Sequence, residues 1–283
     1  MLISVQHRTR YVYDVEARYA IQSLRLAPLS YVGQRVLEWS VTCPGIENAL
    51  RFRDCFGNNM LQVTTLSPHT EIAIEVNGLV ETQDKAGMVV GLAEVTPARV
   101  FRRVTPQTAA DAAIRDLAAT SSGSDTIARL HNLMDLVRNA VDYVPGATHA
   151  HTSAAEALGD GKGVCQDHAH IMIAAARVLG LPARYVTGYL VGEAEAGHAW
   201  AEIFVERLGW VGFDPANRIC PTDHYVRVAC GLDALSATPI RGIRRGGGSQ
   251  AMKVDVEVVR QQQSQSQSQA QTDSAQSQSQ QQA

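Results

Sequence analysis

The chain has 283 residues, of which 45% are hydrophobic, and its formal net charge at pH 7 is -3. This length can bury two medium-sized cores, so we expect two domains. The balanced charge gives no electrostatic basis for binding nucleic acid or an anionic membrane, and it leaves small molecules and peptides open as partners. No apolar run reaches the roughly 18 residues that span a bilayer, and residues 1–8 lack a signal-type apolar run, so we predict a cytoplasmic protein.

The first part of the chain, residues 1–85, alternates apolar and polar residues in short runs such as 36–41 and 71–76. This period of two is typical of β-strands. Turn signals such as Gly57-Asn58-Asn59 separate the runs, and no long helical period interrupts them. The pattern predicts an N-terminal antiparallel sandwich or barrel.

Residues 86–125 are a predicted linker that contains one helix. Thr105-Pro106 has the form of a helix cap followed by proline at the first helical position, so a helix should run from there to about Ala119. From Ile127 to Val144 the apolar residues recur at helical spacing, which predicts an amphipathic helix.

A short helix and a buried helix are expected next. Ser153 and Glu156 have the spacing of a capping box, and the helix that they begin should end near Leu158. The segment 168–179 is apolar on nearly every side, so it should be a helix inside the second domain, ending before Gly180.

The remaining ordered part of the chain has the character of strands. Helices first and an antiparallel sheet afterwards predict an α+β catalytic domain over residues 126–260. Residues 261–283 are almost wholly Gln and Ser, which predicts a disordered tail. The strand-like runs are 183–191, 198–205, 210–214, 225–229 and 252–259.

The five cysteines are odd in number and show no C-x-x-C spacing, so a disulfide framework is not expected. Cys43, Cys55 and Cys230 lie in strand-like apolar runs, and we predict that they are small buried hydrophobes. Cys165 differs, because it follows a glycine-rich segment and opens the predicted buried helix.

The position of Cys165 at the start of a helix favours a nucleophile. Unpaired backbone N–H groups and the positive end of the helix dipole stabilise a thiolate, and the same groups can hold a developing oxyanion. On helix position alone, a buried structural cysteine is an equal alternative.

A thiol nucleophile also needs a base, and His198 is the best candidate. It begins a strand in which alternation puts His198, Trp200 and Glu202 on one face, while Ala199 and its alternate neighbours fill the core face. His198 can therefore point toward the start of the helix or toward solvent. Asp214 ends the next strand and could accept a hydrogen bond from the imidazole.

The connection between Val205 and Trp210 decides whether Asp214 can reach His198. A regular turn of two or four residues would place Asp214 on the opposite face of the sheet. An odd number of loop residues puts both side chains on one face. The hypothesis therefore predicts three or five loop residues, or a bulge at Gly209.

Four segments together resemble the transglutaminase-like superfamily in both motif and order, and the likeness is greatest to bacterial members with an additional N-terminal β domain. The resemblance spans most of Met1 to about Arg260. It implies a papain-like packing of helix and sheet and a Cys-His-Asp triad, carried here by Cys165, His198 and Asp214. The four segments are 163–170, 183–190, 197–200 and 213–215.

The resemblance implies a thiol enzyme that acts on a peptide, protein or small amide through an acyl-enzyme. Water resolves that intermediate by hydrolysis, and an amine resolves it by cross-linking; we expect hydrolysis by a cysteine peptidase or amidase. We assign no role to Gln166, and we interpret Asp167 as a first-turn partner of the helix dipole.

Other classes of site are less well supported. His149, His151, His168 and His170 cluster near Cys165, but residues two apart on a helix point in different directions and no zinc spacing is present. No calcium loop or phosphate-binding loop is recognisable, so we predict activity without a cofactor. An inactive binding or scaffold protein is the remaining alternative. Four aromatic residues could line a cleft but are expected in the core: Tyr185, Tyr189, Trp200 and Trp210.

Overall fold

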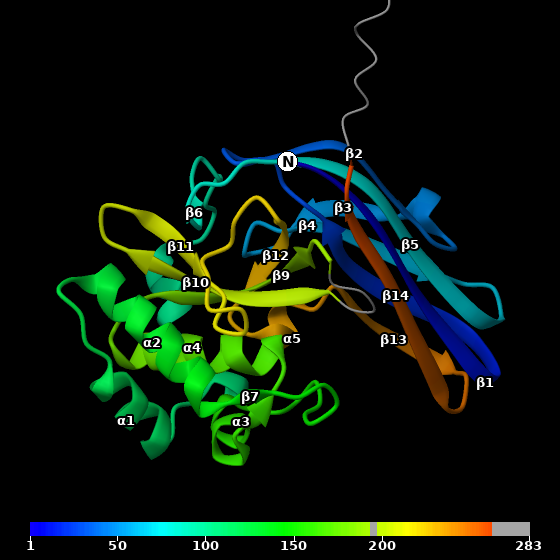
Figure 1. The fold of residues 1–283 in the computed structure, drawn as a ribbon. Coiled ribbons are helices and arrows are strands. Elements are labelled where there is room, and N and C mark those ends of the chain that lie inside the picture. Colours follow the sequence, from blue (N-terminus) through cyan, green and yellow to red (C-terminus); the bar gives the residue numbers. More distant parts are fainter. Residues whose placement is uncertain (193–196, 262–283) are drawn as a thin grey trace, which may run out of the picture.

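The computed structural model describes residues 1–192 and 197–261. The predicted α+β class is confirmed: a curled antiparallel sheet lies beside a second part in which helices pack on another sheet (Figure 1). Apart from Gln261, the predicted tail lies outside the described residues. Within those residues, no helix is long and apolar enough to cross a membrane.

One strand organises the first sheet. β1 (Leu2–Ala27) is 26 residues long; β5 and β14 flank its first half, and β4 and β13 flank its second half. The other strands are β2 (Gln34–Thr42), β3 (Leu50–Arg53), β4 (Asn59–Thr65), β5 (His69–Thr82), β13 (Ile240–Gly246) and β14 (Gln250–Arg260).

The last two strands of the chain therefore complete the first sheet (Figure 1). The sequence grouped 252–259 with the second domain and gave no sign of β13. Its sequence, IRGIRRG, lacks a clear alternation. The pairing partner of each strand is β1, more than 200 residues away, so local pattern does not encode it.

The second sheet has five antiparallel strands in the order β12-β9-β10-β11-β6. Helix α4 packs against β9 and β10 and is surrounded on its other sides by α1, α2 and α3, so the predicted buried helix is present. The strands are β6 (Met88–Val89), β9 (Ala183–Leu190), β10 (His198–Val205), β11 (Gly209–Phe213) and β12 (Tyr225–Gly231); the helices are α1 (Ala112–Thr120), α2 (Thr126–Ala140), α3 (Ala154–Asp160), α4 (Cys165–Val178) and α5 (Ala234–Ala237).

Two predicted helix boundaries were wrong. Helix α1 begins after Asp111, whose Oδ1 accepts a hydrogen bond from the Ile114 N–H at 2.9 Å, whereas the turn that starts at Pro106 is a single 3-10 turn, η3 (Pro106–Thr108). Helix α2 ends at Ala140, because the next residues form β7 (Asp142–Tyr143), which pairs with β8 (Lys162–Gly163). The remaining 3-10 turns are η1 (Ile46–Asn48) and η2 (Ala98–Arg102).

The capping box predicted for the short helix is confirmed. The Ser153 N–H donates to Glu156 Oε2 at 2.8 Å, and the Glu156 N–H donates to Ser153 Oγ at 3.3 Å. These reciprocal bonds satisfy N–H groups that the first turn of α3 cannot pair internally.

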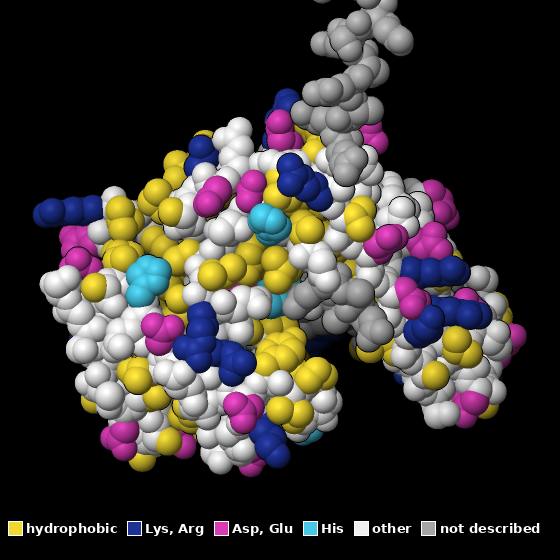
Figure 2. All heavy atoms as spheres, in the orientation of Figure 1, with side chains coloured by type: hydrophobic (Ala, Val, Ile, Leu, Met, Phe, Trp, Pro, Cys, Tyr) yellow, Lys and Arg dark blue, Asp and Glu magenta, His cyan; other side chains and the backbone are white. Residues whose placement is uncertain are grey.

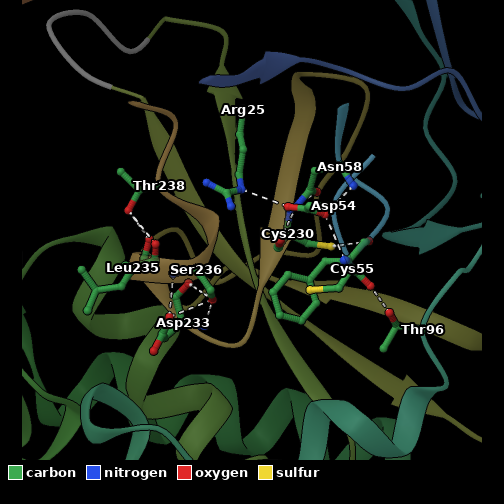
Figure 3. A network of polar contacts seen from close by, with 12 residues as sticks. Arg25, Asp54, Cys55, Asn58, Thr96, Cys230, Asp233, Leu235, Ser236 and Thr238 are labelled. Carbon is green, nitrogen blue, oxygen red and sulfur yellow. Dashed lines mark hydrogen bonds and ion pairs between the residues drawn. The ribbon is translucent and has the colours of Figure 1, made fainter. Parts of the chain in front are cut away.

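The two parts are joined through β12, an edge strand of the second sheet. Gln34 Nε2 donates to the Arg227 carbonyl at 2.8 Å while its Oε1 accepts from the Arg227 N–H at 2.7 Å. Asn58 makes the same pair of bonds to Cys230, both at 2.8 Å, and lies beside it in Figure 3. Two side-chain amides thus bond to the edge of β12 in the way that a neighbouring strand would.

Apolar packing reinforces this attachment. A cluster of buried side chains takes members from both parts of the molecule, so the interface is a continuous core and not only a set of polar contacts. Its members are Ile3, Val5, Val80, Tyr189, Val226, Val228, Ala229, Val256 and Val258.

All five cysteines are free thiols. Cys230 is buried as predicted and Cys43 is partly buried. The prediction for Cys55 was wrong: its side chain is exposed, because it lies in a tight turn in which the Gly57 N–H donates to the Asp54 carbonyl at 3.0 Å.

Candidate active site

The hairpin between β10 and β11 has the predicted geometry. Val205 pairs with Gly209, so residues 206–208 form a loop of three. Continued along the strands, the register sets Asp214 opposite Trp200, on the sheet face that also carries His198. Arg207 and Gly209 adopt positive φ angles of 70° and 80°, which turn the chain within this short loop.

His198 and Asp214 meet as a buried pair. His198 Nε2 lies 2.7 Å from Asp214 Oδ2, and both side chains are almost fully excluded from solvent. Because an ionised carboxylate only accepts hydrogen bonds, Nε2 carries the proton and Nδ1 carries the lone pair. The pairing therefore selects the tautomer in which Nδ1 is the basic atom.

Asp214 is held as a carboxylate by a set of donors. The Tyr225 hydroxyl donates to Oδ2 at 2.7 Å, Asn217 Nδ2 donates to Oδ2 at 2.8 Å, and the Asn217 N–H donates to Oδ1 at 3.3 Å. Burial alone would raise the pKa of Asp214, but the hydrogen bonds from His198, Asn217 and Tyr225 outweigh it and lower the pKa below its usual value.

Sequence reasoning missed both Asn217 and Tyr225. Asn217 follows Asp214 by three residues across a proline, a spacing in which an aspartate often accepts bonds from the turn that follows it. The sequence therefore contained a signal for the contact between Asn217 and Asp214. Tyr225 lies on β12, whose position near Asp214 depends on the order of strands in the sheet, and no local pattern gives that order.

Aromatic rings fix the orientation of the imidazole. The Trp200 ring lies nearly parallel to it at 6.3 Å between centroids, and the Tyr225 ring meets it edge-on at 5.8 Å. Gly188 on β9 pairs with His198, and a Cβ at Gly188 would lie 2.7 Å from the Trp200 ring. All four aromatic residues named from the sequence are buried, as expected.

The rest of this sheet face carries a cluster of buried ion pairs. Glu202 accepts from Arg184 Nε at 2.6 Å and from Arg227 Nε at 2.8 Å, and all three side chains are buried. The Arg184 guanidinium also lies 3.9 Å from the centre of the Trp210 ring. These contacts separate Glu202 from the histidine pair, so it has a structural role.

Cys165 is the first residue of α4 and is partly buried. Asp167 lies in the first turn as predicted, where its Oδ2 accepts from the Val164 N–H at 2.8 Å and from the Thr148 hydroxyl at 2.6 Å. A Cβ at Gly163 would lie 2.7 Å from the Asp167 Cβ, so this close approach requires glycine. The loop before Cys165 is therefore held by two hydrogen bonds to Asp167 and by the close approach of Gly163 to the same side chain.

Cys165 opens the helix that packs against β9 and β10. Cys165 packs against the core cluster that includes Tyr185 on β9, and burial raises the pKa of that tyrosine well above its usual value. Tyr185 in turn pairs with Ala201 on β10.

A single cavity joins the surroundings of Cys165 and His198. Its volume is about 450 Å³, and its lining includes Gln166, Gly188 and Gly197. Gln166 follows Cys165 in the chain, Gly197 precedes His198, and Gly188 is the strand partner of His198. Neighbours of both predicted catalytic residues therefore line the same space.

The histidines considered as metal ligands have other partners. His168 places its two ring nitrogens 2.8 Å and 3.0 Å from the carbonyl oxygens of Val164 and Val141. His170 Nε2 accepts from the Ala234 N–H at 3.0 Å. Across residues 1–192 and 197–261, no group of three His, Cys, Asp or Glu side chains is arranged to hold a metal ion.

Comparison with known proteins supports the family resemblance found in the sequence. Residues 115–215 match the family model of the transglutaminase-like superfamily, and residues 3–81 match the bacterial transglutaminase-like N-terminal region. An uncharacterized protein of Mycobacterium leprae is 32% identical over 277 residues, which cover 90% of this chain and 98% of that protein. The chain belongs to the transglutaminase-like superfamily.

Two further relatives extend this result. An uncharacterized protein of Mycobacterium tuberculosis is 27% identical over 288 residues, covering 90% of this chain and 91% of that protein. A crystal structure from Cytophaga hutchinsonii, provisionally named a cysteine protease, superposes with a TM-score of 0.72 at 22% identity and covers 93% of this chain and 92% of its own. At that identity the superposition establishes the transglutaminase-like fold, including the N-terminal β part.

Proposed function

We propose that this transglutaminase-like protein is a thiol hydrolase that cleaves amide or peptide bonds through an acyl-enzyme on Cys165. His198 acts as the base and Asp214 orients it. The observation that carries this proposal is the buried 2.7 Å hydrogen bond between His198 Nε2 and Asp214 Oδ2, which leaves Nδ1 as the basic nitrogen. Gly197 next to His198 and Gln166 next to Cys165 line the same cavity.

The first half of the reaction forms the acyl-enzyme. His198 Nδ1 takes the thiol proton, and the Cys165 sulfur adds to the carbonyl carbon of the substrate. The first N–H groups of a helix lack partners within it, so the Cys165 N–H at the start of α4 can donate to the oxyanion. The imidazolium then gives its proton to the departing amine, and the carbon–nitrogen bond breaks.

The second half returns the enzyme to its starting state. Nδ1 takes a proton from water, the hydroxide adds to the thioester carbonyl, and the carbon–sulfur bond breaks to release a carboxylic acid while the imidazolium returns its proton to the Cys165 sulfur. Throughout, the Asp214 carboxylate stabilises the positive imidazolium, because its hydrogen bonds keep it ionised.

We propose water and not an amine as the acceptor of the acyl group. A lysine acceptor is cationic until it reacts, and an acidic side chain near its path would attract it. In the described part of the chain, no Asp or Glu lines the cavity beside Gln166. Hydrolysis needs no such group.

Mass spectrometry of a glutaminyl peptide incubated with the protein, with and without a primary amine, tests this proposal. Deamidation or backbone cleavage that is lost in Cys165→Ala and retained in Cys55→Ala is the expected result, since Cys55 is an exposed thiol outside the site. Preferential incorporation of the amine would establish an acyltransferase, and turnover that survives in Cys165→Ala would exclude the proposed nucleophile.

A further inference from the structure

The cavity beside Cys165 is built by both parts of the molecule. Leu26 of β1 and Val254 of β14 line it from the first sheet, and Val228 of β12 lines it from the second. Its volume of about 450 Å³ falls within the range of about 300 to 1,000 Å³ that is usual for small-ligand pockets. Figure 2 shows that the surface is hollowed between the two parts of the molecule.

The part of the lining that the structure describes is uncharged. Among the described residues, no Asp, Glu, Lys or Arg contributes to it. Its one histidine, His7, is buried, and burial lowers the pKa of that ring to about 4, so it is neutral near pH 7. A charged group that entered would lose its hydration with no opposite charge to replace it.

Three polar side chains of the wall, His7, Thr9 and Tyr189, are paired with one another. His7 Nδ1 lies 2.8 Å from the Tyr189 hydroxyl, and His7 Nε2 lies 2.9 Å from Thr9 Oγ1. These bonds occupy both ring nitrogens of His7. Five aliphatic side chains also line the cavity: Leu26, Val228, Ile240, Met252 and Val254.

Strand β12, which lines one side of the cavity, is bonded to the first sheet. The amide side chains of Gln34 and Asn58 bond the first sheet to β12, and Val228, which lies between their backbone partners on that strand, lines the cavity. The Arg25–Asp54 ion pair at 3.0 Å lies beside the Asn58 attachment (Figure 3). A site fixed in this way loses little conformational entropy when it is filled.

We propose that this cavity binds an uncharged, apolar side chain of a peptide substrate, at a residue next to the one whose carbonyl Cys165 attacks. The first sheet thereby acts as the specificity element of the enzyme. This inference rests on the proposed function, because the lining residues Gln166, Gly188 and Gly197 connect the cavity to the two reacting side chains.

Two sets of glutaminyl peptides test the preference with the full-length protein. One set places Leu, Glu or Lys directly before the glutamine and the other places them directly after it, and kcat/KM is measured by mass spectrometry. We expect Leu to be preferred by about 10-fold or more over both charged residues in one of the two sets. Equal turnover of all three in both sets would overturn the inference.

A charge placed in the wall gives a second test. Val254→Glu should lower kcat/KM for the Leu peptide by about 10-fold or more and should narrow the gap between the Leu and Lys peptides. Val259→Glu, an exposed position on the same strand outside the lining, is the matched control. An equal rate of Cys165 alkylation by iodoacetamide in both variants shows that the fold is intact. Equal effects of the two substitutions on the Leu peptide would contradict the proposal.

A binding measurement tests this inference independently of the proposed catalytic function. In Cys165→Ala, calorimetry with the Leu peptide should show weaker binding when Val254→Glu is added. Turnover that persists in Cys165→Ala would exclude the proposed nucleophile and leave this binding result standing. Binding that is insensitive to Val254→Glu would exclude the cavity as the subsite.

Discussion

Val205 pairs with Gly209 across a loop of three residues, and this pairing brings Asp214 to the face of the sheet that carries His198. One residue more or fewer in a regular turn would send the carboxylate to the opposite face. The geometry of the His198–Asp214 pair thus depends on a hairpin whose tip lies several residues away from either side chain.

The positive φ of Gly209 makes this hairpin sensitive to substitution. No atom lies within 4 Å of a Cβ built at Gly209, so a side chain there meets only backbone strain. We predict that Gly209→Val lowers the free energy of unfolding by about 1–2 kcal/mol and that Gly209→Asn lowers it much less, because asparagine tolerates a left-handed backbone. Urea unfolding measures both. Equal losses in the two variants would argue against a conformational cause.

Removing the charge of Asp214 should have a large effect on rate. Asp214→Asn retains the shape of the side chain but no longer stabilises the imidazolium or the required tautomer, and we predict a loss in kcat of about 10³-fold or more. Circular dichroism and thermal unfolding serve as controls for folding. A loss below 10-fold would show that His198 does not depend on Asp214.

The Tyr225 hydroxyl should help to keep the pKa of Asp214 low. Tyr225→Phe removes the hydroxyl that donates to Asp214 Oδ2 and lowers its pKa. The pKa of Asp214 then rises, and we expect the acidic limb of the kcat/KM profile to move to higher pH while the rate at the optimum falls less than in Asp214→Asn. An unshifted profile would leave Tyr225 with a packing role only.

The thiols should differ sharply in reactivity. Burial raises the pKa of both Cys43 and Cys220 to about 11, so only about one molecule in 10⁴ holds either as a thiolate at pH 7. We predict that iodoacetamide at pH 7 labels Cys165 first and that His198→Ala slows this step, with labelling followed by peptide mass mapping. Exposed Cys55 provides the internal reference. Labelling of Cys165 no faster than that of Cys55 would count against an activated nucleophile.

The amide attachments to β12 should contribute to stability. Asn58→Ala leaves the N–H and carbonyl of Cys230 without these buried partners, and we predict a loss of about 1–3 kcal/mol in unfolding free energy. Asn48 is a matched control, since its side-chain amide bonds only to the neighbouring exposed Glu47 carboxylate. Asn48→Ala should change stability by less than about 0.5 kcal/mol. Similar losses of unfolding free energy in the two variants would mean that the bonds from Asn58 to β12 add little to stability.

Local sequence chemistry was sufficient for the elements that carry the site. The period-two alternation of β10, the apolar helix after Cys165 and the Ser153–Glu156 capping box each depend on neighbours within a few residues, and each was predicted. The parity of the hairpin could be stated as a condition in advance, because sheet alternation is strict.

What the sequence did not show depends on long-range contacts. Pairing of β13 and β14 with β1, and the approach of Tyr225 to Asp214, join segments whose meeting is set by the whole fold. The early end of α2 has the same origin, because β7 forms only when β8 lies beside it. Local propensity is overridden in such places by tertiary pairing.

Two buried histidines should make stability fall as the solution becomes acidic. Burial lowers the pKa of His7 and of His170 to about 4, against 6.5 for an exposed ring. The unfolded chain therefore takes up protons below pH 6.5 that the folded chain does not bind until about pH 4, so the stabilisation present above pH 6.5 is lost across this interval. From pH 7 to pH 5 each ring should cost about 2 kcal/mol.

His7→Gln isolates one of these contributions. Glutamine can bond to Tyr189 and Thr9 but does not titrate, so we predict that the part of the stability loss due to His7 disappears while the part due to His170 remains. The free energy of unfolding is measured in urea at pH 7, 6 and 5. His224→Gln, at a histidine that is about half exposed, is the control for the exchange of histidine for glutamine as such. If His7→Gln follows the wild-type curve, the ring does not stay neutral in the folded protein, and the cavity that it lines would then hold a positive charge below pH 6.5.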